Sequence, residues 1–175
     1  MEDLYHWRAQ GFYSLKFRIN NVRNDKVWDF TKIWVMNRMR WENSLMSYEE
    51  DIKNRGFGDW VKAHTSGFKP LHRYEGIFEF TEEEITFGGM DTRLVKEFHL
   101  EIPLREILDI YYGFDEVFKG REERAWPWNK PLRIKYKIND EVKTIYLFVH
   151  FYHKKWIRTS DNKEVYEELK EILRK

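Results

Sequence analysis

The chain has no cysteine and no long apolar run, and only four of its 175 residues are proline. The lack of cysteine excludes a disulfide framework, a cysteine-ligated zinc finger and a cysteine nucleophile. Nowhere do 18 apolar residues follow one another, so the sequence predicts no transmembrane helix. The first residues, MEDLYHWR, lack the basic and apolar regions of a secretory signal. We therefore expect a cytoplasmic protein.

Neither sign of charge dominates, because 31 basic residues face 30 acidic ones. A nearly neutral protein is not drawn to nucleic acid by its net charge, so this balance does not favour a nucleic-acid-binding protein. Aromatic residues make up 18% of the chain, which is more buriable surface than a disordered protein carries. The length is that of one domain with a sizeable core.

Residues 1–71 are predicted to be an N-terminal extension with one strand and one long helix. Apolar and polar residues alternate over 11–19, which is typical of a half-buried strand. Over 25–55 the apolar residues recur every three or four positions, which predicts an amphipathic helix. This helix either runs unbroken or breaks near Asn43, where Ser47 would open a new helix through a capping box.

A second apolar stripe on the predicted helix is a candidate dimer interface. A helix normally buries one stripe against its own domain, so the second stripe needs another cover. Either the remainder of 1–71 covers it, or a second subunit does so in a symmetric dimer. The residues of this stripe are Trp28, Val35, Met39 and Met46.

From Tyr74 onward the apolar period changes to two, which predicts an antiparallel meander of strands. Asn139 and Asp140 are typical of a two-residue hairpin turn, so Ile138 should face Glu141 and Leu132 should face Leu147. The strands are predicted at 74–80, 84–89, 94–102, 107–112, 132–138 and 142–151, and a helix at 161–174. The predicted class is α+β, with 72–175 as the sheet domain.

Three features of this domain resemble the pleckstrin-homology-like superfamily. They are the order of the strands, the segment IPLREI at 102–107, and the segment SDNKE at 160–164 leading into the last helix. Residues 72–174 are similar in particular to bacterial pleckstrin-homology-like and GRAM-type domains. The resemblance implies a curved sheet closed into a small barrel, with the helix at one open end.

The resemblance also implies a role in binding. In phosphoinositide-binding members, Lys and Arg lie between the first two strands, whereas the corresponding turn here is Thr81–Glu84, with three carboxylates. A phosphorylated headgroup is therefore disfavoured. Such barrels commonly serve as interaction scaffolds, so we expect a non-enzymatic module that recognises a protein or peptide. The alternative is a barrel that carries an apolar ligand or lipid.

The segment 113–131 is a candidate partner surface. It is longer than a hairpin turn, and long loops in compact domains are often functional. Pro127 fixes the backbone between two indoles and could present them to a partner. The alternative is that the rings fold back as a lid over the barrel. The candidate residues are Phe114, Phe118, Trp126 and Trp128.

The outer face of the 132–151 hairpin is a candidate anion site. Arg133, Lys135 and Lys137 lie opposite aromatic and small residues, and cations beside aromatic rings can bind phosphates or bases. Weak contact with an anionic membrane surface also stays open. The structural alternative is that these cations protect a sheet edge from aggregation.

Catalytic and metal motifs are missing from the sequence. It contains no Gly-x-Ser-x-Gly elbow and no phosphate-binding glycine loop. His150 and His153 are three residues apart on a predicted strand, where they would point to opposite faces. We therefore predict no catalytic residues, no metal and no cofactor.

Overall fold

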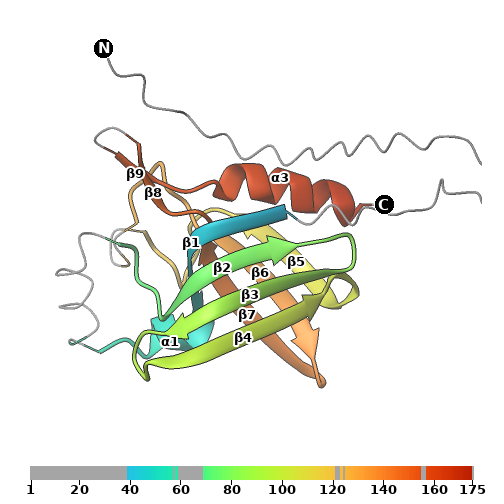
Figure 1. The fold of residues 1–175 in the computed structure, drawn as a ribbon, viewed down its shortest axis with the longest axis horizontal. Coiled ribbons are helices and arrows are strands. Elements are labelled where there is room, and N and C mark those ends of the chain that lie inside the picture. Colours follow the sequence, from blue (N-terminus) through green and yellow to red (C-terminus); the bar gives the residue numbers. More distant parts are fainter. Residues whose placement is uncertain are drawn as a thin grey trace, which may run out of the picture. The chain divides into compact units, whose positions relative to one another are not determined.

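The computed structural model describes residues 39–56, 58, 69–120, 123, 125–154 and 157–174, and within them the chain forms a seven-stranded antiparallel sheet (Figure 1). The strand order is β4-β3-β2-β1-β7-β6-β5, and β8 and β9 form a separate hairpin. No helix among these residues is long and apolar enough to cross a membrane. The elements are β1 (Met39–Tyr48), α1 (Glu49–Lys53), β2 (Tyr74–Phe80), β3 (Glu84–Asp91), β4 (Lys96–Pro103), η2 (Leu104–Glu106), β5 (Ile107–Tyr112), β6 (Leu132–Ile138), β7 (Glu141–Phe148), β8 (Tyr152–Lys154), β9 (Ile157–Thr159) and α3 (Asn162–Ile172).

The predicted meander and closing helix are confirmed, with small changes at their ends. The β6–β7 hairpin has the predicted register, with Leu132 opposite Leu147. Asn139 and Asp140 have φ values of 48° and 64°, the left-handed conformation that this tight turn requires. The strand predicted at 94–102 begins later than expected, at Lys96, and Leu94 lies exposed in the turn before β4.

The predicted helix over 25–55 is wrong for residues 39–48, which form strand β1. β1 pairs with β2 on one side and with β7 on the other, so the predicted domain boundary at 71/72 is also wrong. Residues 1–38, including the predicted strand at 11–19, lie outside the described residues.

The cause of this error is that β1 is covered on both faces. Its residues 44–47 are all buried, with Met46 in one hydrophobic cluster and Leu45 in another. A strand with two buried faces loses the alternation that identifies a strand from sequence. The helix that does follow is short, and Asp51 accepts the Tyr48 backbone N–H at its start, 3.2 Å away.

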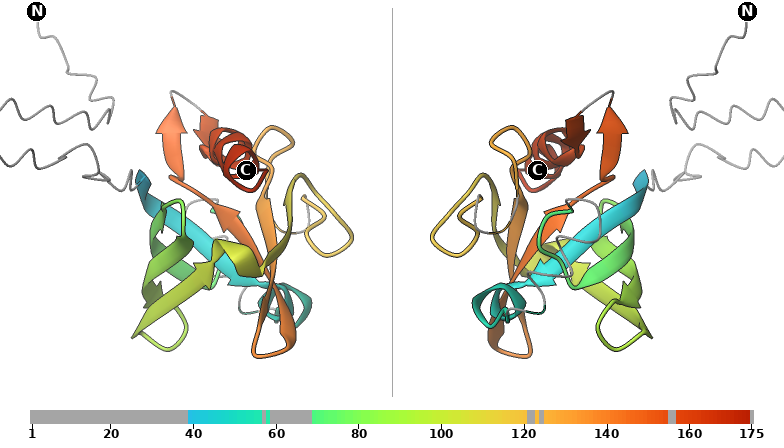
Figure 2. Two further views of the ribbon diagram at one scale, coloured as in Figure 1. Left: turned by 90° about the vertical axis from the view of Figure 1, so that its right-hand side faces the viewer. Right: turned by 90° about the vertical axis from the view of Figure 1, so that its left-hand side faces the viewer.

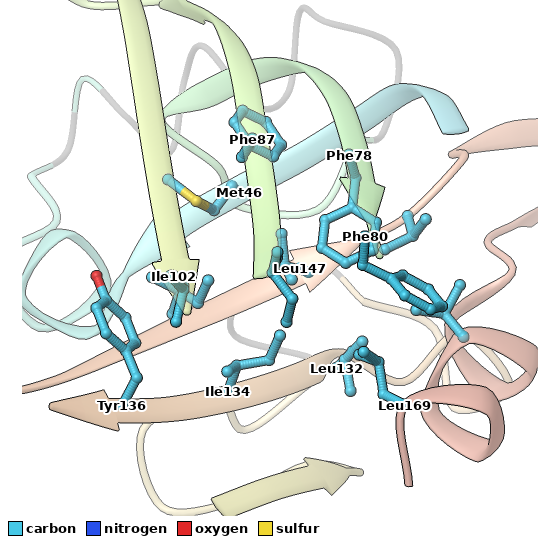
Figure 3. Packing of buried hydrophobic residues seen from close by; sticks show 14 of the residues in the cluster. Met46, Phe78, Phe80, Phe87, Ile102, Leu132, Ile134, Tyr136, Leu147 and Leu169 are labelled. Carbon is cyan, nitrogen blue, oxygen red and sulfur yellow. The ribbon is translucent and has the colours of Figure 1, made fainter. Parts of the chain in front are cut away.

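The main core lies between the two halves of the sheet and α3. Aromatic rings from β2 and β3 face aliphatic side chains from β6 and β7, and Leu169 of α3 packs beside Leu132 (Figure 3). Trp41 stacks on Phe80 with ring centroids 5.3 Å apart. Such burial supplies the dominant stabilising term of the fold.

A second, smaller core lies on the outer face of β7. The cover of this face comes from α1 and from the loop 113–131. Phe118 of the loop contacts Tyr146 and Phe148, with both centroid distances 5.5 Å. The buried members are Leu45, Ile52, Phe118, Ala125, Tyr146 and Phe148.

Two glycines inside the sheet allow β2 and β3 to approach closely. Gly76 pairs with Gly89, and a Cβ at Gly76 would lie 2.1 Å from the Gly88 carbonyl oxygen. Any side chain there would force the strands apart, so glycine is required by space rather than by backbone dihedral.

Candidate functional site

The loop 113–131 is tied to the sheet by Asp115 at its beginning. One carboxylate oxygen accepts the backbone N–H groups of Val117 and Phe118, at 3.0 and 2.8 Å. The other accepts the Tyr146 hydroxyl at 2.8 Å and the Arg133 guanidinium at 2.9 Å. Burial alone would raise the pKa of Asp115, but these hydrogen bonds outweigh it and lower the pKa below its ordinary value.

Phe114 and Phe118 belong to the second core and not to a partner surface. Phe118 is fully buried, and Phe114 is partly buried against the same cluster. The prediction that these two rings face a partner is therefore wrong for Phe118. Phe114 packs against the same core cluster. The physical reason is that the outer face of β7 is apolar and needs a cover.

Trp126 and Trp128, by contrast, project from the loop. Their side chains are 47% and 51% exposed, and the two indoles stack with centroids 5.1 Å apart and planes 10° apart. The Asn129 N–H donates to the Trp126 carbonyl at 2.8 Å, which closes a turn with Pro127 as its second residue. The two rings therefore form one continuous aromatic surface on a defined turn.

This turn is fastened to the β8–β9 hairpin. The indole N–H of Trp128 donates to the Arg158 carbonyl on β9, at 3.3 Å. Ser160, just after β9, donates to the Asn129 side chain at 2.5 Å. In Figures 1 and 2, α3 and the β8–β9 hairpin lie beside one another at the same end of the sheet.

The side chain of Asn162, at the start of α3, joins the end of the loop 113–131 to the end of β7. Its side-chain amide donates to the carbonyls of Lys130 and Leu147, both at 2.8 Å, and its oxygen accepts the Val149 N–H at 2.7 Å. All three bonds are made by a side chain that is 1% exposed. Sequence reasoning missed this role, because an asparagine before a helix is equally typical of a cap.

The predicted anion site on the β6–β7 hairpin lies on one face, but most of its charge is already neutralised. Arg133 pairs with Asp109 at 2.7 Å and with Asp115, and Lys137 pairs with Asp140 at 2.8 Å. Lys135 is exposed and, within the described part of the chain, has no ion-pair partner. A single such cation does not make an anion site.

The predicted dimer stripe is not reproduced as a surface. Trp28 and Val35 lie outside the described residues. Met46 is fully buried in the main core, and Met39 packs against that core from the beginning of β1. The expectation that Met46 meets a second subunit is therefore wrong, since its neighbours come from the same chain.

A groove of about 500 Å³ lies beside a bulge in β1. Glu75, on the rim of this groove, has a lowered pKa. Hydrogen bonds from His72 and Lys69 outweigh the effect of burial and lower the pKa to about 2. A carboxylate held this way is a poor proton acceptor near neutral pH. The lining residues are Glu42, Asn43, Ser44, Leu45, Lys69, Glu75, Gly76, Ile77 and Phe151.

Ser44, His150 and Asp161 lie near this bulge but do not form a catalytic triad. The Ser44 hydroxyl is fully buried, donates to the Trp41 carbonyl at 3.2 Å and accepts the His150 backbone N–H at 3.1 Å. The His150 ring instead pairs with Asp161 at 2.7 Å. Among the residues that the structure describes, no group of three metal-binding side chains is found.

A partly buried charge network that the sequence did not reveal lies just before β2. Arg73 binds Asp51 at 2.7 Å and Asp91 at 2.8 Å, and these hydrogen bonds raise its pKa. Asp91 also accepts the backbone N–H groups of Arg93 and Leu94 in the β3–β4 turn. These contacts join α1 to that turn, so the network stabilises the fold.

The geometry thus leaves Trp126 and Trp128 as the sequence-predicted site residues that are both exposed and rigidly positioned. The other candidate residues are buried, are paired with carboxylates, form no site by themselves, or lie outside the described residues. No protein-family model and no curated protein matches the sequence.

Proposed function

We propose that this chain is a non-enzymatic binding module, similar to the pleckstrin-homology-like domains, that recognises a protein or peptide through Trp126 and Trp128. The antiparallel seven-stranded sheet and the C-terminal helix α3 are compatible with this resemblance, which rests on the sequence of residues 72–174. The observation that carries the function is the stacked, half-exposed indole pair.

Exposed indoles favour association for two physical reasons. Tryptophan is enriched among the residues that contribute most to binding, because a partner can remove its large apolar area from water. The pair is also held before binding by the Asn129 turn and by the bond from Trp128 to Arg158, so little side-chain entropy is lost on association.

The packing of the sheet interior supports a binding module over an apolar-ligand carrier. Phe78, Phe80, Phe87 and Tyr136 all lie in the main core with at most 1% of their surface exposed. Bulky rings from opposite sides occupy the space that a lipid or similar ligand would need.

A displayed peptide library selected on the whole protein tests this proposal. Peptides are selected on the wild type after removal of those that bind the Trp126→Ala/Trp128→Ala variant. The matched control is Leu94→Ala, which removes another exposed apolar side chain, 58% exposed, from the turn before β4.

We expect enriched peptides whose affinity falls at least about tenfold in the double variant and stays unchanged in the Leu94→Ala control. Peptides that bind all three proteins equally would overturn the proposal. So would the absence of any enriched peptide. A wild-type dimer in sedimentation that the double variant converts to monomer would assign the indole pair to self-association instead.

A further inference from the structure

We infer that the partner segment is acidic, and that the cations beside the indole pair recognise its carboxylates. This inference rests on the proposed function and adds the chemistry of the partner. It comes from the charge around Trp126 and Trp128, which is distinct from the nearly neutral balance of the whole chain.

Arg158, on the β8–β9 hairpin, is the first source of this charge. Between Val149 and Asp161 the sequence contains no Asp or Glu. Arg158 lies on β9 at the residue whose carbonyl accepts the Trp128 indole N–H, and His153 faces it across the hairpin. The indole pair is therefore joined to β9 at Arg158.

Lys130 is the second source, since it follows the indole turn directly and is exposed. Its ammonium lies 5.9 Å from the centroid of the Tyr112 ring, and within the described ranges no carboxylate pairs with it. The nearest acid after the hairpin, Asp161, is already engaged by His150 at 2.7 Å. An acidic ligand would thus meet cations that no described carboxylate neutralises.

A peptide fits this surface better than a nucleic acid does. The two indoles stack on each other with planes 10° apart, so they do not leave a slot between them for a base. Nucleic-acid binding draws its affinity from many phosphate contacts, whereas the described cations beside the indole turn are Arg158 and Lys130. Side-chain carboxylates spaced along an extended peptide need only two or three such partners.

Three peptide libraries with identical apolar positions test the inference on the whole protein. Their polar positions hold Asp and Glu, or Asn and Gln, or Lys and Arg. Affinities of enriched members are measured for the wild type, for Arg158→Gln and for Lys130→Gln. Lys135→Gln is the matched control, because it removes an exposed cation from β6, away from the indole turn. Oligo-dT and phosphatidylserine vesicles are measured in parallel.

We expect enrichment from the Asp and Glu library, with affinity that falls about tenfold between 50 and 500 mM NaCl because exposed charges are screened. Arg158→Gln and Lys130→Gln should each weaken binding about threefold or more, and Lys135→Gln should not.

The other outcomes separate this inference from the proposed function. Equal, Trp-dependent binding of the Asn and Gln library would overturn the acidic partner while leaving peptide recognition intact. Absence of Trp-dependent binding from all three libraries would overturn the proposed function as well. Binding of oligo-dT or vesicles with no peptide binding would overturn both in favour of a phosphate-bearing partner.

Discussion

The two halves of the loop 113–131 each carry two aromatic rings, but the rings of the two halves differ in how far they are exposed to solvent. In the first half Phe118 is fully buried on β7, whereas in the second half Trp126 and Trp128 are about half exposed. The difference does not follow from hydrophobicity alone, because all of these rings are large and apolar over most of their surface.

What distinguishes the halves is how each is anchored. Asp115 turns the first half back toward β6 and β7, where Tyr146 and Phe148 offer an apolar surface. In the second half, the Asn162 side chain donates to the Lys130 backbone carbonyl, and the Trp128 indole N–H donates to the Arg158 carbonyl on β9. A loop can therefore be well ordered without burying its largest side chains, and such a loop is suited to recognition.

Phe118→Ala should have the largest effect on this comparison. Removing a fully buried ring from between Tyr146 and Phe148 leaves a cavity, and we expect a loss of about 3–5 kcal/mol in the free energy of unfolding. Chemical denaturation followed by circular dichroism measures it. A loss below about 1 kcal/mol would mean that the first half of the loop is not part of the core.

Asn162→Ala should come next, because it removes the side chain that joins the second half of the loop to β7. Three backbone groups lose their partner, two of them in buried hydrogen bonds, and we expect about 2–4 kcal/mol of destabilisation. Lys163→Ala, an exposed neighbour on α3, is the control and should stay close to the wild type. If the two variants unfold at the same denaturant concentration, Asn162 does not anchor the loop.

Asp115→Asn should lower stability by about 1–3 kcal/mol at neutral pH, since the charged acceptor of four hydrogen bonds is lost. The pKa of Asp115 is lowered in the folded state, so its contribution is present above its unfolded pKa and is lost as the pH falls through the folded value. The gap between wild type and variant should therefore narrow below about pH 4. Denaturation curves at several pH values test this, and a constant gap would contradict it.

Trp126→Ala should have the smallest effect on folding. The ring is half exposed and its main described contact is the stack on Trp128, so we expect a loss below about 1 kcal/mol. Near-ultraviolet circular dichroism should still change, because the coupled indole pair is lost. A fall comparable to that of Phe118→Ala would show that both halves of the loop are core, and it would remove the basis of the proposed binding surface.

Local signals in the sequence were sufficient where a segment has one buried face or a dedicated turn. The register of β6 and β7 follows from Asn139 and Asp140, two residues that tolerate positive φ, together with alternation along both strands. Val165 and Leu169 are likewise four residues apart, and both are buried on the inward face of α3. In such segments the spacing of the apolar residues reflects packing of one face against the core.

The same signals failed for β1 because it lies in the middle of the sheet. Trp41, Leu45 and Tyr48 have helical spacing, but Leu45 and Met46 are buried on opposite faces of a strand. Part of the second cover is α1, which follows β1 directly, but the rest is the loop 113–131, which lies more than 60 residues later and so falls outside any local window of sequence.

The sequence by itself determined the meander, the tight hairpin, the closing helix and the presence of aromatic rings in the loop 113–131. Only the tertiary structure decided which of those rings face water. That choice depends on the apolar outer face of β7 and on the bonds that Asp115 and Asn162 make to distant strands. Contacts between residues far apart in the chain set it, and local propensity contains no record of them.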